Sequence, residues 1–248
     1  MTIITHYNLD LDAASSAALA LIVNAEKNPK LRFISTSVTW DEIKDEITEE
    51  DLVLDIDASG KGLKGKISAF SSYIALLETK WALYFMDLAD IIDATDLGLT
   101  SQAPDLNEFF LNIKYALNSD EEVVSYWKVF LEGIIKRQDE LKRAYDQLDR
   151  VKWYDSIAVM PRDAERPLSK LLKQNGASFV IYEEDGAQGI IISNKVPNDL
   201  RQRLALALPD WFFHEKGFII AWGTKKGFKK ENSGYTAMDL VNLIKDLS

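Results

Sequence analysis

The feature that most constrains the fold is a short apolar segment near the start of the chain, which leads into three polar residues. Ile3-Ile4-Thr5 is β-prone, and residues 13–25 are rich in Ala and Leu. His6, Asp10 and Asp12 follow the first segment and precede the second. This order predicts a strand, a loop and a helix, with all three polar side chains in the loop beyond the carboxyl end of the strand.

The same alternation continues along the first half of the chain. Residues 31–36 are a second predicted strand, and residues 51–57 are a third, which ends in Asp55 and Asp57. Helical patterns follow at 68–97, 105–117 and 121–148. Strands that alternate with helices predict an α/β fold with a doubly wound, mainly parallel sheet. Ligands of such sheets bind beyond the carboxyl ends of the strands.

The second half carries its own set of patterns and a different charge. Strands are predicted at 156–160, 178–182, 189–193 and 217–222, and helices at 168–174 and 198–208, with a hairpin turn at Glu183-Glu-Asp-Gly. Residues 1–150 hold 27 acidic and 15 basic side chains, whereas residues 151–248 hold 12 and 14. We therefore expect an α/β domain at 1–120, a helical connector at 121–150 and a smaller α/β domain at 151–248.

Composition excludes several classes of protein. No window reaches the roughly 18 apolar residues of a membrane span, and the start lacks the order of a signal peptide, so we expect a cytoplasmic protein without a membrane partner. The chain has no Cys, which excludes disulfides and thiolate metal sites. The net charge of −10 disfavours duplex nucleic acid as a partner.

The polar residues that follow the predicted strands form a hard, oxygen-rich set. An imidazole with several carboxylates suits Mn²⁺ or Mg²⁺ better than structural zinc. We expect these side chains to meet in one crevice at the sheet edge. The candidate ligands are His6, Asp10, Asp12, Asp55 and Asp93.

Each of these assignments has an alternative. An Asp that precedes a helix can cap its N-terminus, which applies to Asp10 and Asp12. Asp57 is an alternative to Asp55, and Asp96 is an alternative to Asp93.

His6, Asp10, Asp12 and Ala13 resemble motif I of the DHH phosphoesterase superfamily, in which a His precedes two Asp by four and six residues. The apolar segment that ends in Asp55 is similar to motif II, and the segment Ile91-Ile-Asp-Ala-Thr-Asp is similar to a later Asp motif. The superfamily includes RecJ-type exonucleases, manganese-dependent inorganic pyrophosphatases and nanoRNases. The resemblance implies a metal-binding first domain and a smaller substrate-binding domain across a cleft.

The resemblance also implies roles for single residues. His6, Asp10, Asp12 and Asp55 match the catalytic and metal-binding positions. One ion is expected on His6, Asp10 and Asp55, and a second on Asp12, Asp55 and Asp93.

The chain departs from the family at the motif that names it. No His lies between His6 and His214, and Gly60-Lys-Gly-Leu-Lys-Gly-Lys stands where Asp-His-His is expected. The Gly-rich, His-containing motif near the C-terminus is missing in its usual form, and Asn232-Ser-Gly-Tyr-Thr stands there. In the family, one of the missing His residues normally ligates the second ion. The resemblance therefore leaves two expectations open, a site with one ion and a site with two.

Two groups of Lys are candidates for phosphate binding. An ammonium group neutralises phosphate oxygens, and neighbouring aromatic rings stack bases. The candidates are Lys61, Lys64 and Lys66 in the Gly/Lys loop, and Lys225 and Lys226 near the aromatic residues of the second half. For both groups the alternative is a solvated loop.

Residues and resemblance together predict a DHH-like hydrolase that uses a divalent metal. Its substrate is a phosphoester or phosphoanhydride of a nucleotide, a short single-stranded oligonucleotide or a small phosphorylated molecule. The alternative is a catalytically degenerate nucleotide-binding sensor or assembly module of the same fold, which the loss of the His pair favours. A third option is a structural protein that interacts through the charged helix at 121–148. The aromatic stripe at 81–92 is either core or the contact of a homodimer.

Overall fold

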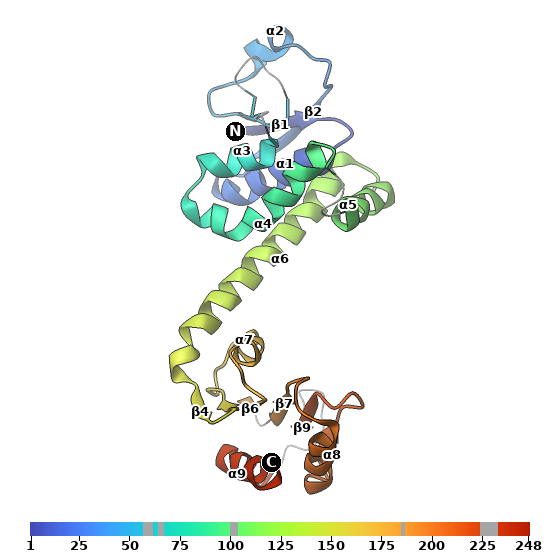
Figure 1. The fold of residues 1–248 in the computed structure, drawn as a ribbon. Coiled ribbons are helices and arrows are strands. Elements are labelled where there is room, and N and C mark those ends of the chain that lie inside the picture. Colours follow the sequence, from blue (N-terminus) through green and yellow to red (C-terminus); the bar gives the residue numbers. More distant parts are fainter. Residues whose placement is uncertain (57–61, 64–66, 100–103, 185–186, 224–232) are drawn as a thin grey trace. The chain divides into compact units, whose positions relative to one another are not determined.

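The computed structural model describes residues 1–56, 62–63, 67–99, 104–184, 187–223 and 233–248. The chain forms two compact units, Met1–Arg137 and Gln138–Ser248 (Figure 1). The first contains a parallel three-stranded sheet and the second a mixed six-stranded sheet. The predicted α/β class, with a parallel sheet in the first half, is therefore confirmed. The domain limits at 120 and 150 stay a prediction, and the boundary between the units lies inside one helix.

The first unit is built on three short parallel strands in the order β2-β1-β3. These are β1 (Thr2–His6), β2 (Lys30–Ile34) and β3 (Leu52–Val53). His6 pairs with Ile34 at the ends of β1 and β2, and Ile4 pairs with Val53 of β3. Since β1 is the central strand, the residues that follow it emerge at the middle of the sheet edge.

Helices surround this sheet. They are α1 (Leu11–Val23), α2 (Trp40–Ile43), α3 (Ala69–Leu76), α4 (Thr79–Asp96), α5 (Pro104–Ala116) and α6 (Asp120–Asp146), with short 3₁₀ turns at Ala25–Lys27 and Lys44–Glu46. The single helical stretch expected at 68–97 is two helices. The chain breaks between them because Leu77 and Glu78 have extended backbone, with ψ of 172° and 147°.

Alternate residues of the strands face opposite layers, as the two-residue period of a strand requires. Ile3 packs against the buried small residues of α1 and the apolar faces of α3 and α4. Ile4 packs on the other face with Ile34, Val53 and Ile43 of α2. The sheet is therefore buried on both faces, as expected for parallel strands.

Trp127 of α6 is the largest fully buried side chain among those that the structure describes in the first unit. Its indole Nε1 donates a hydrogen bond of 2.7 Å to Ser15 Oγ in α1. Its rings contact Phe110 of α5 edge to face and Phe130 by stacking, at centroid distances of 5.3 and 4.6 Å. Trp127 thus ties the start of α6 to the helix that follows the central strand.

The second unit holds a sheet in the order β4-β5-β6-β7-β9-β8. Its strands are β4 (Lys152–Tyr154), β5 (Ile157–Val159), β6 (Phe179–Glu184), β7 (Ala187–Ile192), β8 (Phe212–Phe213) and β9 (Ile219–Trp222); its helices are α7 (Leu168–Gln174), α8 (Asn198–Ala207) and α9 (Ala237–Leu247), with a 3₁₀ turn at Leu148–Arg150. β5 and β6 are parallel, whereas the other pairs are antiparallel. The expected hairpin is present, because Glu184 pairs with Ala187 between β6 and β7.

Three elements of the second unit were not expected from the sequence. β4 and β8 have three and two residues, which is too short to show a period. α9 has a sequence signal that was missed: Thr236 and Asp239 form a reciprocal capping box at its start.

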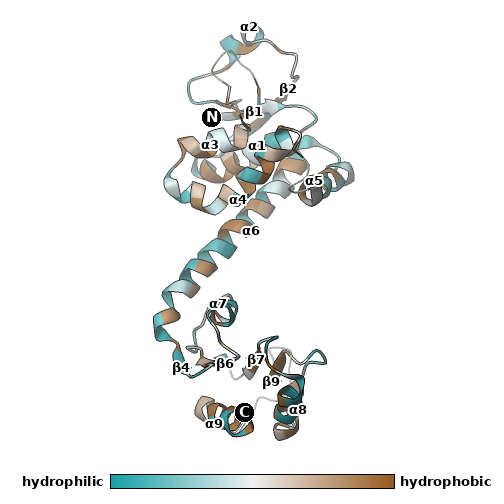
Figure 2. Cartoon of the chain, in the orientation of Figure 1, coloured by the Kyte–Doolittle hydropathy of each residue, from teal (hydrophilic) through white to brown (hydrophobic). Residues whose placement is uncertain are grey.

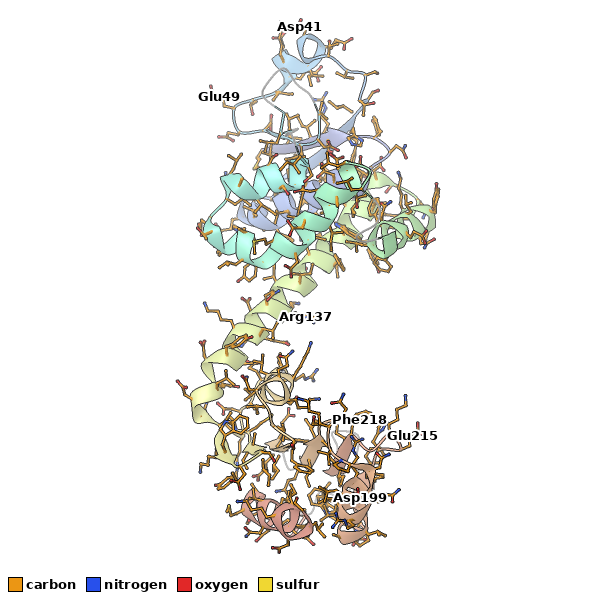
Figure 3. The ribbon with its side chains drawn as sticks, viewed as in Figure 1. Asp41, Glu49, Arg137, Asp199, Glu215 and Phe218 are labelled. Carbon is orange, nitrogen blue, oxygen red and sulfur yellow. The ribbon has the colours of Figure 1, made fainter. Side chains whose placement is uncertain are left out.

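Surface character differs along the chain. Asp41 on α2 and Glu49 before β3 are exposed acidic residues of the first unit (Figure 3). Hydrophilic residues recur along α6 (Figure 2).

Among the helices in the described part of the chain, none combines the length and apolar character that a membrane crossing needs.

Trp127→Ala is expected to lower the free energy of unfolding of the first unit by about 3–5 kcal/mol, because it leaves a large cavity and unpairs Ser15. Because the two units need not unfold together, amide hydrogen exchange is used to measure the free energy of unfolding of each unit separately. The control is Trp153→Ala, which removes a Trp of the second unit that is 42% exposed. Equal loss of protection in the first unit from both substitutions contradicts the assigned role of Trp127.

Candidate metal centre

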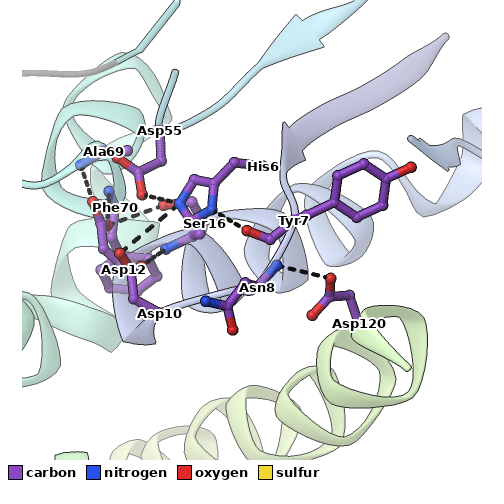
Figure 4. A network of polar contacts seen from close by, with 11 residues as sticks. His6, Tyr7, Asn8, Asp10, Asp12, Ser16, Asp55, Ala69, Phe70 and Asp120 are labelled. Carbon is purple, nitrogen blue, oxygen red and sulfur yellow. Dashed lines mark hydrogen bonds and ion pairs between the residues drawn. The ribbon is translucent and has the colours of Figure 1, made fainter. Parts of the chain in front are cut away.

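Three of the predicted ligands meet beyond the carboxyl end of β1 (Figure 4). His6 ends β1, Asp10 directly precedes α1, and Asp55 follows β3. Each offers one ligand atom, and these atoms all lie within 4.8 Å of one another. His6 Nε2 lies 2.9 Å from Asp55 Oδ2 and 3.8 Å from Asp10 Oδ2. The strand order explains the meeting, because β1 and β3 are parallel neighbours that end at the same edge.

The His6 ring makes hydrogen bonds on both nitrogens. Nδ1 lies 2.8 Å from the carbonyl oxygen of Tyr7, which can only accept, and Nε2 faces the Asp55 carboxylate. Nδ1 therefore carries a proton. The hydrogen bond to Asp55 raises the pKa of His6 from 6.5 to about 9, although burial opposes this change.

This arrangement fits a metal ligand. A ligating His commonly donates its second N–H to a backbone carbonyl, which fixes the ring and leaves the other nitrogen for the ion. Here the Tyr7 carbonyl holds Nδ1, so Nε2 is the nitrogen that would be available to an ion once its proton has left. An imidazole with two carboxylates suits Mn²⁺ or Mg²⁺.

Asp10 caps a helix with one carboxylate oxygen and turns the other toward His6, and its role as a metal ligand stays a prediction. It is the N-cap of α1, where its Oδ1 accepts a hydrogen bond of 2.9 Å from the backbone N–H of Ala13. Its Oδ2 faces His6. The Asp10 side chain is 57% exposed, so the group opens to solvent on this side.

Asp55 is buried and has an unusual backbone conformation. Its φ is +54°, in the left-handed region that residues other than Gly seldom adopt. The backbone N–H of Asp55 donates to the carbonyl of Leu63 at 3.2 Å, which holds the chain in this conformation. Asn8, near His6, also has a positive φ of 60°, as do Asn28 and Asp155 elsewhere in the chain; Asn and Asp adopt this region more readily than other residues with a side chain.

Asp12 has different partners from the three-residue group. It is 3% exposed; its Oδ2 accepts from the backbone N–H of Ala69 at 2.7 Å, and its Oδ1 from that of Phe70 at 2.8 Å. Burial, followed by the negative charge of Asp55, raises the pKa of Asp12 from 3.8 to about 7. Asp12 thus anchors the N-terminus of α3 to α1, and its role as a metal ligand stays a prediction.

Asp93 of α4 contacts the N-terminus of α3, the same terminus that Asp12 contacts. Its Oδ1 accepts a hydrogen bond from the Ser68 hydroxyl and a second, of 2.7 Å, from the Ser71 hydroxyl. Asp96 lines a hollow of about 350 Å³ together with Asp10 and Asp12. Within the described residues, the group that can hold an ion includes none of Asp12, Asp93 and Asp96.

Other predicted residues fall elsewhere. Asp57 and the candidate phosphate-binding lysines lie outside the described residues; these lysines are Lys61, Lys64, Lys66, Lys225 and Lys226. His214 precedes the turn to β9, and its ring packs against Phe218 with centroids 4.0 Å apart.

Sequence reasoning missed Ser68 and Ser71 as partners of Asp93. The available signal was the Ser at 68, a preferred N-cap residue directly before a helical pattern. Ser68 is indeed the N-cap of α3, and its hydroxyl accepts from the backbone N–H of Ser71.

Comparison with known proteins gives likenesses to solved structures, two of which are described here. No family model matches the chain, and no curated protein matches it. The fold is similar to RecJ from Thermus thermophilus in complex with Mn²⁺, with a TM-score of 0.36 and 10% identity over 99% of this chain and 52% of RecJ. RecJ from the same organism in complex with Mg²⁺ gives 0.35 and 10% over 99% and 49%. The chain spans about half the length of RecJ, and likenesses at this level do not establish a shared activity.

Mn²⁺ affinity is expected to rise by up to about tenfold per pH unit between about pH 6 and pH 8, because the ion displaces the Nε2 proton of His6. Calorimetry in two buffers of different ionisation enthalpy measures the released proton. His6→Ala is expected to abolish both binding and proton release, whereas the control His214→Ala leaves them unchanged. An affinity that does not change with pH contradicts the assignment of His6.

Asp12→Ala is expected to lower the free energy of unfolding of the first unit by about 1–3 kcal/mol, because two buried N–H groups lose their acceptor. The raised pKa of Asp12 means that its stabilising contribution is complete below about pH 4 and is lost as pH rises through about 7. Hydrogen exchange without metal is expected to show this loss in the wild type and not in Asp12→Ala. The control is Asp87→Ala, at an exposed position of α4; an equal effect of both substitutions refutes the role.

Proposed function

We propose that the chain is a metal-dependent phosphoesterase in which His6, Asp10 and Asp55 hold one Mn²⁺ or Mg²⁺ ion. The observation that carries this proposal is the meeting of one imidazole and two carboxylates within 4.8 Å at the carboxyl ends of two parallel strands. The proposed substrate is a phosphoester or phosphoanhydride of a nucleotide, a short single-stranded oligonucleotide or a small phosphorylated molecule.

The residues of the site have distinct tasks in this proposal. A bound divalent cation supplies Lewis-acid polarisation of a phosphoryl oxygen and lowers the pKa of a water molecule. His6 releases its Nε2 proton and keeps its Nδ1 hydrogen bond to Tyr7. Asp55 contributes a buried carboxylate, whose position is set by β3 and the bond from Asp55 N–H to Leu63. Asp10 forms the exposed side, where substrate enters.

We propose one ion rather than two. A second ion on Asp12, Asp55 and Asp93 is not supported by the geometry, because within the described residues the group of ligand atoms that lie within 4.8 Å of one another contains neither Asp12 nor Asp93, and both Asp12 oxygens accept backbone N–H groups of α3. Asp93 is likewise engaged with Ser68 and Ser71. In this proposal Asp12 and Asp93 hold α3 in place beside the ion.

The remaining predicted residues bind the substrate in this proposal. Lys61, Lys64 and Lys66 of the first unit neutralise phosphate oxygens in this proposal, and Lys225 and Lys226 are a separate proposed phosphate-binding group of the second unit. These assignments rest on the sequence, because the five lysines lie outside the described residues.

A nucleotide-binding module without catalysis is the second candidate. The observation that favours it is that three ligands meet in the described part of the site while Asp12 and Asp93 have structural partners. Sites that clamp both the attacking and the leaving oxygen commonly use two ions. In this version the chain binds nucleotide and does not hydrolyse it.

Hydrolysis of bis(p-nitrophenyl) phosphate and of pyrophosphate under a Mn²⁺ titration separates the candidates. We expect turnover that depends on metal and falls by more than about 100-fold in Asp55→Asn, which exceeds the loss typical of an outer-sphere residue. The control is Asp41→Asn, at an exposed position of α2. No metal-dependent turnover, together with nucleotide binding in the presence of chelator, refutes the enzyme and supports the binding module.

A further inference from the structure

A second hollow of the first unit is lined in part by Tyr7, the residue that follows His6 of the candidate metal centre. It encloses about 560 Å³. Its lining includes Tyr7, Arg32, Phe33, Ser119, Asp120 and Glu121, and we call it the Tyr7 pocket. It adjoins the carboxyl ends of β1 and β2, where open α/β sheets bind their ligands, and Tyr7 directly follows His6.

The backbone that carries Tyr7 is held in place by three hydrogen bonds. The Tyr7 N–H donates to the Ile34 carbonyl at 2.8 Å, and the Tyr7 carbonyl accepts from His6 Nδ1 at 2.8 Å. The Asn8 N–H donates to Asp120 Oδ2 at 3.0 Å, which joins the loop to the start of α6 (Figure 4). A wall that is ordered before a ligand arrives lowers the entropic cost of binding.

The aromatic wall of the pocket is open to solvent. Tyr7 is 59% exposed, and its ring lies beside that of Phe33 with centroids 6.3 Å apart and an angle of 32° between the planes. An exposed ring at the edge of a pocket offers a face on which a nucleobase can stack, and each such contact typically contributes about 1–3 kcal/mol.

The lining that α6 contributes to the pocket is acidic. Asp120 and Glu121 stand in the first turn of α6. Arg32 forms an ion pair with Glu46, so its charge is already compensated. This wall repels phosphate and accepts hydrogen bonds, because an ionised carboxylate has no proton to donate.

We propose that the Tyr7 pocket binds the guanine base of the substrate, with Tyr7 stacked on the base and the carboxylates of Asp120 and Glu121 accepting its N–H groups. Guanine fits best among the four bases because its N1–H and N2–H₂ donors are adjacent. The proposal rests on the proposed function, since it puts the phosphate next to the base, on the His6 side. It names the substrate of that site as a guanine nucleotide or a strand that ends in guanine.

Titration of guanosine into the full chain with chelator present, followed by NMR, tests the pocket without metal or phosphate. Guanosine is expected to bind at least about tenfold more tightly than adenosine, cytidine or uridine. Tyr7→Ala is expected to weaken guanosine binding by about 5- to 100-fold, and Tyr7→Phe to preserve it. Glu121→Ala is expected to reduce the preference for guanosine over adenosine to less than about threefold.

Two control variants lie on α5 of the same unit. Tyr115→Ala removes a tyrosine that is 85% exposed, and Glu108→Ala removes an exposed carboxylate; neither is expected to change guanosine binding. Guanosine binding that is undetectable, or unchanged in Tyr7→Ala, overturns the proposal. Equal affinity for all four nucleosides overturns the assignment of guanine.

Two further experiments extend this test. The first asks whether the guanine belongs to a free nucleotide or to the end of a single strand, and the second separates the pocket from the proposed enzymatic activity. With Mn²⁺ present, GMP is compared with a single-stranded tetranucleotide that ends in guanine; tighter binding of either supports the pocket and names the source, and binding of neither overturns it. Guanosine binding without any phosphoester hydrolysis removes the enzyme and leaves the pocket. Metal-dependent hydrolysis of a guanine-containing substrate with the same KM in wild type and Tyr7→Ala removes the pocket and leaves the enzyme.

Discussion

The bond between His6 and Asp55 is the interaction on which the rest of the candidate site depends. It joins the ends of β1 and β3, two neighbouring strands, through residues that are 49 positions apart along the chain. A buried carboxylate beside a buried imidazole is stable only because each neutralises the other. In the proposed metal site, a cation would take the place of the proton between these two side chains, so the same contact that raises the pKa of His6 also holds two of the proposed ligand atoms together.

The four acidic residues around this imidazole have different roles because they accept hydrogen bonds from different donors. Asp10 uses one oxygen for the cap of α1 and turns the other toward His6. Asp12 accepts two backbone N–H groups of α3, and Asp93 accepts two hydroxyl groups at the same terminus. Asp55 directs its Oδ2 to the imidazole. All four residues are Asp, so the type of side chain does not predict their roles. The hydrogen-bond donor that each carboxylate meets sets its role.

Much of the fold follows from local patterns. The period of the strands, the small residues of α1 and the helical periods of α4 to α6 mark these elements directly in the sequence. The break at Leu77 and Glu78, the short strands β4 and β8, and the two-residue length of β3 are not visible in this way. Their limits depend on which neighbouring strand or helix is available, and a tertiary contact overrides local propensity in such short segments.

By itself, the sequence determined the class of fold, the presence of a His and several Asp at strand ends, and the kind of metal they suit. Only the tertiary structure decided that His6, Asp10 and Asp55 form the group while Asp12 and Asp93 support α3. The reason is geometric. Asp10 and Asp12 are two positions apart in the sequence, and this spacing does not show which hydrogen-bond donor each carboxylate meets. The donors to Asp12 are Ala69 and Phe70 of α3, more than fifty residues further along the chain. Tertiary structure also placed the start of α6 beside the loop that carries Tyr7. The contact is the hydrogen bond from the Asn8 N–H to Asp120, two residues that are 112 positions apart in the sequence.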